Sequence, residues 1–503
     1  MSESLSAEHE QLGQIVTEII ARYAATLDEA RVCSEASPGE LEKMFDEPLP
    51  LAGVDARQLF ARFADEIAPH LMNIPSPRYY GLFNPTPLAV GVWADALCSA
   101  INQNGAAWRN SPSASVIEAR VLRWLCEIVG YGAESFGTLT SGGSEANLIA
   151  LKCARDRAAD FVRDRGMRAA SLPAPRTLNK ESPESATPGN MIVYASEQCH
   201  YSFVKSVDIL GLGRENLRKV ATDERFHLRT DFLRREIERD LDVGNLPICI
   251  AGAAGATSTG IIDPLDELAQ IADEYKLWFH VDGAYGGALA MSEKYKDRLR
   301  GIERADSVTI DPHKWMFVPF AAGAVLMRDG ARVLRDAFDI TPEYLSEERG
   351  GEDVPFDFFR YGQLGTRRFN ALKIWFALKT LGVSGYAKII ERQIELTGYF
   401  AARIAELEGF ECIGQIETAV CCLRFVPGEM REREGAELDA MQRELQRRIE
   451  RSGEAWLSTT VLNGRRALRV NVNSFLTEQR HMDDLVELLR RESNELLKAR
   501  KVL

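Results

Sequence analysis

Residues 307–315 read Ser-Val-Thr-Ile-Asp-Pro-His-Lys-Trp, and residues 281–287, which precede them, read Val-Asp-Gly-Ala-Tyr-Gly-Gly. Each stretch follows or contains a short apolar run that predicts a strand, and each then changes to polar and turn-forming residues. Asp282 and Lys314 therefore stand near the ends of two predicted strands. A carboxylate and an amine at such positions decide how the rest of the chain is interpreted.

Short apolar runs rich in Val, Ile and Ala alternate with helical patterns between about residues 86 and 330. This alternation predicts a mostly parallel sheet with helices on both faces. Ligand sites in such sheets lie at the carboxyl ends of the strands, which is where Asp282 and Lys314 fall. Strands are expected at MIVYA (191–195), PICIAG (247–252), WFHVDG (278–283), SVTI (307–310) and AAGAVLM (321–327).

The chain has 503 residues, which is more than one hydrophobic core usually holds, so we expect several domains. Residues 1–85 form the first, a helical arm whose apolar stripes pack on another subunit or on the main body. Residues 86–385 form the large α/β domain, and residues 386–503 form a small C-terminal α/β domain. The proline-containing segment 166–190 is expected to be a long surface loop.

Within these domains, the helical patterns of the arm cover residues 7–31 and 55–71, and a further helix is expected at 366–381. In the C-terminal domain, strands are expected at 419–426 and 467–473.

Composition narrows the classes of partner. The formal net charge of -13 would repel a phosphate backbone, so no nucleic acid is expected as a partner. No apolar run approaches the 18 residues of a membrane helix, and the N-terminal residues lack the pattern of a signal peptide, so we expect a cytoplasmic protein that does not enter a membrane. The nine cysteines and seven histidines show no metal-ligand spacing, and neither disulfides nor a metal are expected.

The segment TLTSGGSEANLIALKCAR (138–155) places a Ser/Gly turn directly before a helical pattern. Free backbone N–H groups and the positive end of the helix dipole favour an anion at such a point, and Gly142, Gly143 and Ser144 would hold a phosphate. An ordinary capped helix, with Ser141 or Ser144 as the N-cap, explains this segment equally well when it is taken alone.

Lysine and a carboxylate together suit pyridoxal 5'-phosphate. The amine of Lys314 would form a Schiff base with the cofactor aldehyde, and the carboxylate of Asp282 would keep the pyridine nitrogen protonated. His200, which follows the predicted strand 191–195, could stack on the cofactor ring. A solvated lysine is the ordinary alternative for Lys314, but the phosphate turn, His200, Asp282 and Lys314 occur in order, each beside a predicted strand. The glycines of GAAGATSTG (252–260) miss the dinucleotide-binding spacing, which disfavours a nicotinamide enzyme.

The motifs TSGGSEAN, EQCHYS, VDGAYGG and DPHKW, in this order, resemble the pyridoxal-phosphate-dependent group II amino-acid decarboxylases. This family includes the aromatic L-amino-acid, histidine and glutamate decarboxylases, and the similarity runs from about residue 40 to the C-terminus. The resemblance implies an α/β fold of type I and a homodimer whose active sites are built from both chains. It also implies a carboxy-lyase that converts an L-amino acid to the amine and CO2.

For the cofactor site, the resemblance implies that Lys314 is the Schiff-base lysine, Asp282 the pyridinium partner and His200 the ring-stacking histidine. Ala284 matches the small residue under the ring, and Thr257 matches a cofactor contact.

For the substrate site, the resemblance implies that His313 lies near the phosphate and the substrate. Arg469 matches the arginine near the substrate carboxylate, and Tyr344 matches the loop tyrosine that delivers a proton to Cα. Because this tyrosine is present, plain decarboxylation is favoured over the alternative activity of an aldehyde synthase.

The substrate is expected to carry an aromatic side chain like that of Trp, Tyr or Phe, because Leu82 and Phe83 stand where aromatic decarboxylases keep apolar contacts. The stretch Asn102 to Asn104 instead resembles the glutamate decarboxylases, and Ala106 replaces a bulky residue of the aromatic enzymes. Asn104 is therefore a candidate substrate contact, and an acidic amino acid such as glutamate, aspartate or cysteine sulfinate remains the alternative substrate. Such a substrate would need a second cation, for which Arg78 and Arg109 are candidates.

Overall fold

The computed structural model describes residues 2–167, 189–340, 356–430 and 435–501. Its chain divides into two compact units. The first unit comprises residues 1–86, 396–413 and 421–503, and the second unit comprises residues 87–395 and 414–420. Among the helices in the described ranges, none is both long and apolar enough to cross a membrane.

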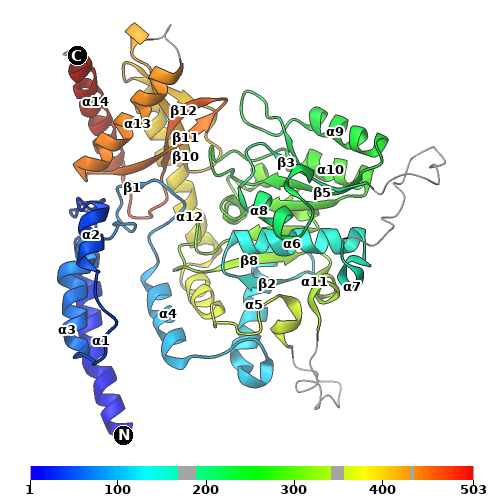
Figure 1. The fold of residues 1–503 in the computed structure, drawn as a ribbon, viewed down its shortest axis with the longest axis horizontal. Coiled ribbons are helices and arrows are strands. Elements are labelled where there is room, and N and C mark those ends of the chain that lie inside the picture. The colour runs from blue at the N-terminus through cyan, green and yellow to red at the C-terminus, as the bar shows by residue number, and fades with distance from the viewer. Residues whose placement is uncertain (1, 168–188, 341–355, 431–434, 502–503) are drawn as a thin grey trace. The chain divides into compact units, whose positions relative to one another are not determined.

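The second unit is built on a seven-stranded sheet with the strand order β2-β8-β7-β6-β5-β3-β4 (Figure 1). The neighbours from β7 to β4 pair in parallel, and β8 is antiparallel to both β7 and β2. The predicted mostly parallel sheet is confirmed. Its strands are β2 (Phe136–Thr140), β3 (Met191–Ser196), β4 (Leu217–Val220), β5 (Leu246–Ala253), β6 (Trp278–Asp282), β7 (Ser307–Ile310) and β8 (Gly323–Met327).

Helices cover both faces of this sheet. Successive strand residues point to opposite faces, and the buried residues of these strands need a packing partner on each side. On β5, Cys249 and Ala251 face the cluster that contains α6, whereas a Cβ at Gly252 would meet Leu265 and Leu268 of α10. The helices of this unit are α4 (Ala89–Ile101), α5 (Pro112–Ile128), α6 (Gly143–Ala158), α7 (Val162–Arg165), α8 (Ser202–Ile209), α9 (Thr230–Asp242), α10 (Leu265–Tyr275), α11 (Gly330–Phe338) and most of α12 (Ala371–Ala405).

The helix expected at 366–381 begins at Ala371 and continues, after a break, to Ala405. The break is at Gly382, whose φ of 62° lies in the left-handed region that glycine tolerates and other residues rarely adopt. The predicted end of the helix at residue 381 thus coincides with the end of its first straight part.

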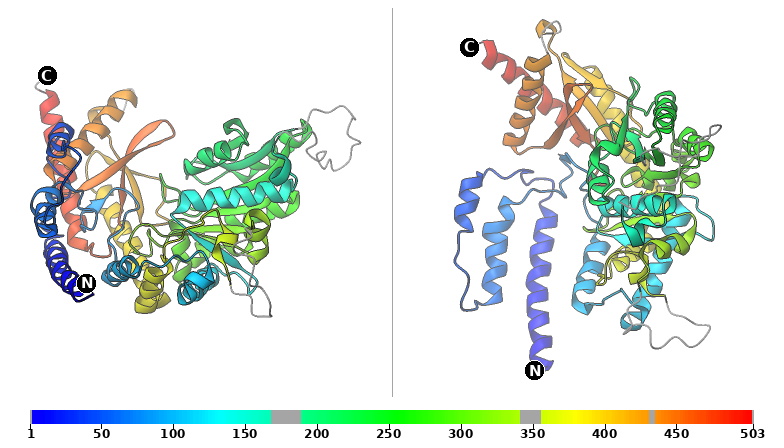
Figure 2. Two further views of the ribbon diagram at one scale, coloured as in Figure 1. Left: turned by 60° about the horizontal axis from the view of Figure 1, so that its bottom comes forward. Right: turned by 45° about the vertical axis from the view of Figure 1, so that its right-hand side comes forward.

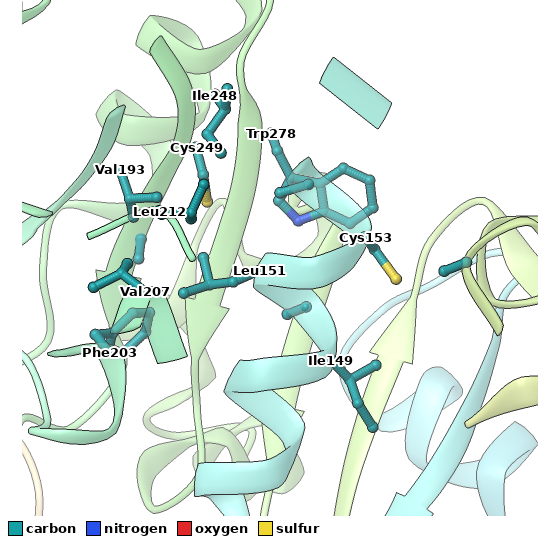
Figure 3. Close-up of a cluster of buried hydrophobic side chains, with 14 of the residues drawn as sticks. Ile149, Leu151, Cys153, Val193, Phe203, Val207, Leu212, Ile248, Cys249 and Trp278 are labelled. Carbon is teal, nitrogen blue, oxygen red and sulfur yellow. The ribbon is translucent and has the colours of Figure 1, made fainter. Parts of the chain in front are cut away.

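A buried cluster fixes α6 and α8 to the sheet (Figure 3). Leu151 of α6, Phe203 of α8, Val193 of β3 and Cys249 of β5 are at most 1% exposed, and Trp278 of β6 packs with them. Close packing of this kind resists displacement. It therefore holds the N-terminus of α6 at a constant position beside the carboxyl ends of the strands.

The first unit contains a five-stranded sheet with the order β1-β11-β12-β10-β9. β1 lies at the end of the arm and pairs with β11, so the arm and the C-terminal residues share one unit. The strands are β1 (Tyr79–Tyr80), β9 (Phe410–Ile413), β10 (Val420–Phe425), β11 (Trp456–Leu462) and β12 (Arg465–Asn471), and α13 (Gly435–Ser452) and α14 (Gln479–Lys501) accompany them.

Of the three described arm helices, two were predicted, and these end before the predicted residues 31 and 71, whereas the helix at 38–44 was not predicted. They are α1 (Ser2–Ala25), α2 (Pro38–Met44) and α3 (Ala56–Arg62), and α3 continues as short non-α turns to His70. Helices α1 and α3 run beside each other (Figure 2).

Candidate active site

Two neighbouring strands bring the candidate residues together. Asp282 is the last residue of β6, and it pairs in register with Thr309 of β7. Beyond β7, the backbone N–H of Asp311 donates to the carbonyl oxygen of Ala284 at 3.1 Å. A turn closed by the Lys314 N–H and the Asp311 carbonyl, at 2.9 Å, then places Lys314 beside them. The strand ends thus meet as the sequence predicts.

Asp311 is a member of the site that the sequence analysis did not single out. Its side chain is 2% exposed, and Oδ2 lies 3.1 Å from Nζ of Lys314. The same oxygen accepts a hydrogen bond of 3.0 Å from the backbone N–H of Gly143, the first residue of α6. The signal in the sequence was a carboxylate three residues before the lysine, at the end of an apolar strand.

The start of α6 forms a cradle that admits no side chains. A Cβ at Gly142 would lie 3.0 Å from Cε1 of His313, and a Cβ at Gly143 would lie 3.0 Å from Oδ2 of Asp311 and 3.1 Å from Cβ of Ala284. Ser144 follows them and is exposed. A side chain at either glycine would therefore press on these neighbours, and the N–H of Gly143 is bonded to Asp311.

Neither Ser141 nor Ser144 is the N-cap of α6, whose first N–H is accepted by the side chain of Asp311 instead. The N-cap residue is Gly142. Ser141 is instead turned toward Glu145, whose carboxylate accepts hydrogen bonds from the Ser141 N–H at 2.7 Å and from its Oγ at 2.8 Å.

Both candidate histidines are neutral because they are withdrawn from water. Burial lowers the pKa of His200, and the charge of Lys314 acts in the same direction, whereas Asp282 and Asp311 oppose it. Burial also lowers the pKa of His313, whose Nδ1 accepts the backbone N–H of Ala322 at 3.0 Å. The neutral ring of His313 therefore carries its proton on Nε2, which lies 3.6 Å from Oδ2 of Asp311.

Asp282 is held by two donors. Nδ2 of Asn147 donates to Oδ2 at 2.9 Å, and the backbone N–H of Ala284 donates to Oδ1 at 3.2 Å. Thr257 lies in the turn that follows β5 and is exposed. Tyr344, the predicted proton donor, lies outside the described residues.

In the first unit, two of the predicted substrate residues, Arg469 and Phe83, are in contact. The guanidinium of Arg469 lies 4.6 Å from the ring centre of Phe83, and it also donates to the carbonyl oxygen of Gly81. Arg469 is 3% exposed and Phe83 8% exposed, whereas Leu82 is half exposed. A cation and apolar side chains are therefore adjacent there.

Asn104 has a structural task in the second unit. Its Oδ1 accepts hydrogen bonds from the backbone N–H groups of Ala106 at 3.2 Å and Arg367 at 3.0 Å. Together with Lys152 and Arg155 it lines a cavity of about 1030 Å³. Both of those cations already bind the carboxylate of Asp156 at 2.5 and 2.8 Å.

Arg78, a candidate cation for an acidic substrate, is also engaged. Its guanidinium donates to the carbonyl oxygens of Ala30 at 2.6 Å and Glu454 at 2.8 Å, within the first unit. Arg109 is exposed. Across the described ranges, no group of three or more His, Cys, Asp or Glu side chains is placed to hold a metal ion.

Residues 38–426 match the profile of the pyridoxal-dependent decarboxylase conserved domain. The chain belongs to this family. Its cofactor is pyridoxal 5'-phosphate, and it is a carboxy-lyase of amino acids. The residues of the second unit fit the cofactor, because a helix that begins with Gly142 and Gly143, a lysine amine and a buried carboxylate lie together at adjacent strand ends.

Relatives within the family differ in their substrates. The chain is 28% identical to an aromatic-L-amino-acid decarboxylase of Bacillus atrophaeus, over 97% of each chain. It is 30% identical to the acidic amino acid decarboxylase GADL1 of Xenopus tropicalis, over 82% of this chain and 77% of the relative. The crystal structure of mouse CSAD in its apo form superposes with a TM-score of 0.88 and 26% identity, covering 97% of this chain and 99% of the other.

The cradle predicts that Gly143→Ala weakens cofactor binding. The added methyl group would press on Asp311 and Ala284, and overpacking of this kind costs about 1–3 kcal/mol, so the dissociation constant of the cofactor should rise about tenfold or more. Titration of the cofactor-free protein, followed by tryptophan fluorescence, measures it. Gly398→Ala is the control, because a Cβ there meets nothing within 4 Å. Equal affinities in both variants would contradict the placement of the phosphate.

Proposed function

We propose that this decarboxylase acts on an L-amino acid with an aromatic side chain, with Lys314 as the lysine that binds the cofactor. The observation that carries the cofactor assignment is that the buried carboxylate of Asp311 contacts both the amine of Lys314 and the backbone N–H of Gly143. The observation that supports the substrate assignment is the contact of Arg469 with Phe83.

When bound, pyridoxal 5'-phosphate supplies an electron sink for the bond that breaks at Cα of the substrate. In our proposal, Asp282 stays anionic and holds a proton on the ring nitrogen. The start of α6 at Gly142, Gly143 and Ser144 would lie beside the phosphate, and His313 would donate to it from Nε2, while the N–H of Gly143 stays bonded to Asp311.

The ring itself is held by apolar contact and by stacking. We assign this task to Ala284 and His200, because Ala284 is small and buried and the His200 ring is neutral. Thr257 is assigned a further contact with the cofactor from the sequence resemblance.

Lys314 must lose a proton before its amine can attack an aldehyde carbon. Oδ2 of Asp311 lies 3.1 Å from Nζ, so we assign it the task of receiving that proton. The hydrogen bond from Gly143 keeps this oxygen in place meanwhile.

For the substrate, we propose that the carboxylate of the amino acid binds Arg469 and that its side chain contacts Leu82 and Phe83. The candidate Arg78 and the cavity cations Lys152 and Arg155 have partners in the structure, which favours an aromatic substrate over an acidic one. The contact of Asn104 with substrate and the proton transfer from Tyr344 to Cα remain predictions from the sequence. The same is true of the cytoplasmic location.

Lys314→Ala should remove the visible absorbance of the bound cofactor and lower turnover by more than about a thousandfold, since covalent attachment is lost. Absorption spectra before and after borohydride treatment, together with assays of CO2 release, test this. Lys294→Ala removes an exposed lysine that pairs with Glu395, and it should behave like the unaltered protein. Retention of a borohydride-sensitive band in the Lys314 variant would overturn the assignment.

The substrate proposal predicts that kcat/KM for L-Trp, L-Tyr or L-Phe exceeds that for L-Glu, L-Asp and cysteine sulfinate by about tenfold or more, because one desolvated apolar contact alone is worth about 1–3 kcal/mol. Release of CO2 from each amino acid and the identity of the product decide it. A preference for acidic substrates would overturn the aromatic assignment. An aldehyde in place of the amine would establish the aldehyde-synthase alternative.

We further propose that the chain is a homodimer. In the second unit, α4 presents Trp93, Leu97 and Ile101 at a spacing of four residues, and they are 44%, 46% and 54% exposed. In the first unit, Leu49 and Leu51 of the arm are 81% and 95% exposed. Apolar side chains gathered in this way mark protein interfaces.

Leu97→Glu should therefore shift the dimer toward the monomer, since a charge would have to be buried in the interface. Light scattering over a range of concentrations measures the mass. Val243→Glu places the same charge at another position that is 70% exposed, and it should leave the mass unchanged. A monomeric unaltered protein at every concentration would refute the proposal.

A further inference from the structure

We propose that His280, supported by Ser307 and Trp278, is a positioning residue that holds the carboxylate of Asp282 through the amide of Asn147. The proposal rests on the function proposed above, in which Asp282 faces the ring nitrogen of the cofactor. It adds three residues that lie one, two and three hydrogen bonds behind Asn147, and none of them needs to touch the cofactor.

The amide of Asn147 is the centre of the arrangement, and it makes all four hydrogen bonds of which a primary amide is capable. Nδ2 donates to Oδ2 of Asp282 at 2.9 Å and to Oγ of Ser202 at 3.0 Å. Oδ1 accepts from Oγ of Thr309 at 2.7 Å and is 3.0 Å from Nε2 of His280. These four contacts come from three elements, α8, β6 and β7, because Asp282 and His280 both belong to β6. The amide is therefore held from several sides.

The orientation of this amide follows from charge. If it were rotated by half a turn, Oδ1 would face the carboxylate of Asp282, and two acceptors would meet without a proton between them. The amide nitrogen therefore faces Asp282, and the amide oxygen faces His280. Because that oxygen can only accept, Nε2 of His280 must carry a proton and donate it.

The imidazole of His280 is neutral, so only one of its two nitrogens carries a proton. Burial lowers the pKa of His280 to about 4, although the charge of Asp282 and the backbone of Ser307 act in the opposite direction. With the proton on Nε2, Nδ1 is an acceptor. Oγ of Ser307 lies 2.8 Å from Nδ1 and must donate to it.

Trp278 fixes the direction of that last bond. Its indole Nε1 can only donate, and it does so to Oγ of Ser307 at 2.8 Å. The hydroxyl proton of Ser307 is then directed to His280. The hydrogen bonds thus run in one direction, from Trp278 through Ser307, His280 and Asn147 to Asp282, and each donor determines the next.

We call this series of hydrogen bonds, from Trp278 through Ser307, His280 and Asn147 to Asp282, the relay. Its residues behind Asp282 are shielded from water. Asn147, His280, Ser307 and Thr309 are at most 1% exposed, and Trp278 is 3% exposed. In such surroundings hydrogen bonds polarise one another, and a polar group that loses its partner cannot replace it with water. A change at His280 should therefore alter the hydrogen bond that Asn147 donates to the carboxylate of Asp282.

The same amide also reaches the other face of the proposed cofactor site. Oγ of Ser202, which receives the second Nδ2 proton of Asn147, lies 2.8 Å from Nδ1 of His200. The backbone N–H of Ser202 also donates to this nitrogen, at 3.3 Å. Asn147 thus connects the carboxylate assigned to the ring nitrogen with the histidine assigned to the ring face.

The test compares His280→Leu, which removes both ring nitrogens, with His280→Gln, whose amide can still donate to Asn147. The protein is reconstituted with pyridoxal 5'-phosphate labelled with 15N in the ring, and the nitrogen chemical shift reports protonation of the ring. We expect the shift of His280→Leu to move toward that of an unprotonated ring and the shift of His280→Gln to return toward that of the unaltered protein. The value of kcat should fall about ten- to hundredfold, the range known for outer partners of metal ligands, with KM nearly unchanged.

Ser307→Ala provides a second test if the His280 variants do not fold. It removes one oxygen atom and leaves the imidazole ring of His280 in place. It should move the nitrogen shift in the same direction by a smaller amount. The control is His481→Leu, at a buried histidine of the first unit that binds Asp28, and it should leave the shift unchanged.

The outcomes separate this proposal from the function on which it rests. A protonated ring nitrogen in both His280→Leu and Ser307→Ala, together with its loss in Asp282→Asn, would overturn the relay and retain the role of Asp282. An unprotonated nitrogen in the unaltered protein would overturn the role of Asp282 itself. Equal shifts in His481→Leu and His280→Leu would show a general loss of packing and would also overturn the relay.

Discussion

The parallel pairing of β6 with β7 is the constraint on which the second unit's chemistry depends. The register that opposes Asp282 to Thr309 sets the carboxylate at the end of one strand beside the turn that begins at Asp311 on the next. Lys314 lies in that turn, and its amine forms an ion pair with the carboxylate of Asp311. A shift of one residue in this pairing would send these side chains to opposite faces of the sheet.

Buried polar groups explain why this edge of the sheet can be rigid without being apolar. Asn147, Thr309 and His280 lie within a core where a missing hydrogen bond costs about 1–3 kcal/mol, and each has partners. The apolar cluster of Leu151, Phe203 and Trp278 begins directly beside them. Trp278 belongs to both, since its ring packs in the cluster while its N–H bonds to Ser307.

The sequence predicts much of this arrangement, because apolar strands, turn residues and helix starts are local signals. β3, β5, β6 and β7 lie where their apolar runs predicted them, and the family match confirms the cofactor. β4 was not predicted, since Leu-Arg-Lys-Val is short and charged. A strand was expected before the phosphate turn, but β2 was given no bounds, since Phe-Gly-Thr-Leu-Thr contains a glycine. The task of Asn147 could not be predicted, because it depends on contacts between four separate segments. The domain boundaries and the roles of the site residues remain predictions.

Asp311 has one further consequence for the second unit. Its carboxylate satisfies the first N–H of α6 and neutralises the ammonium of Lys314 with a single oxygen. The start of the helix and the lysine amine therefore share one internal counterion. A substitution of this one aspartate would therefore disturb the start of the helix and the lysine amine at the same time.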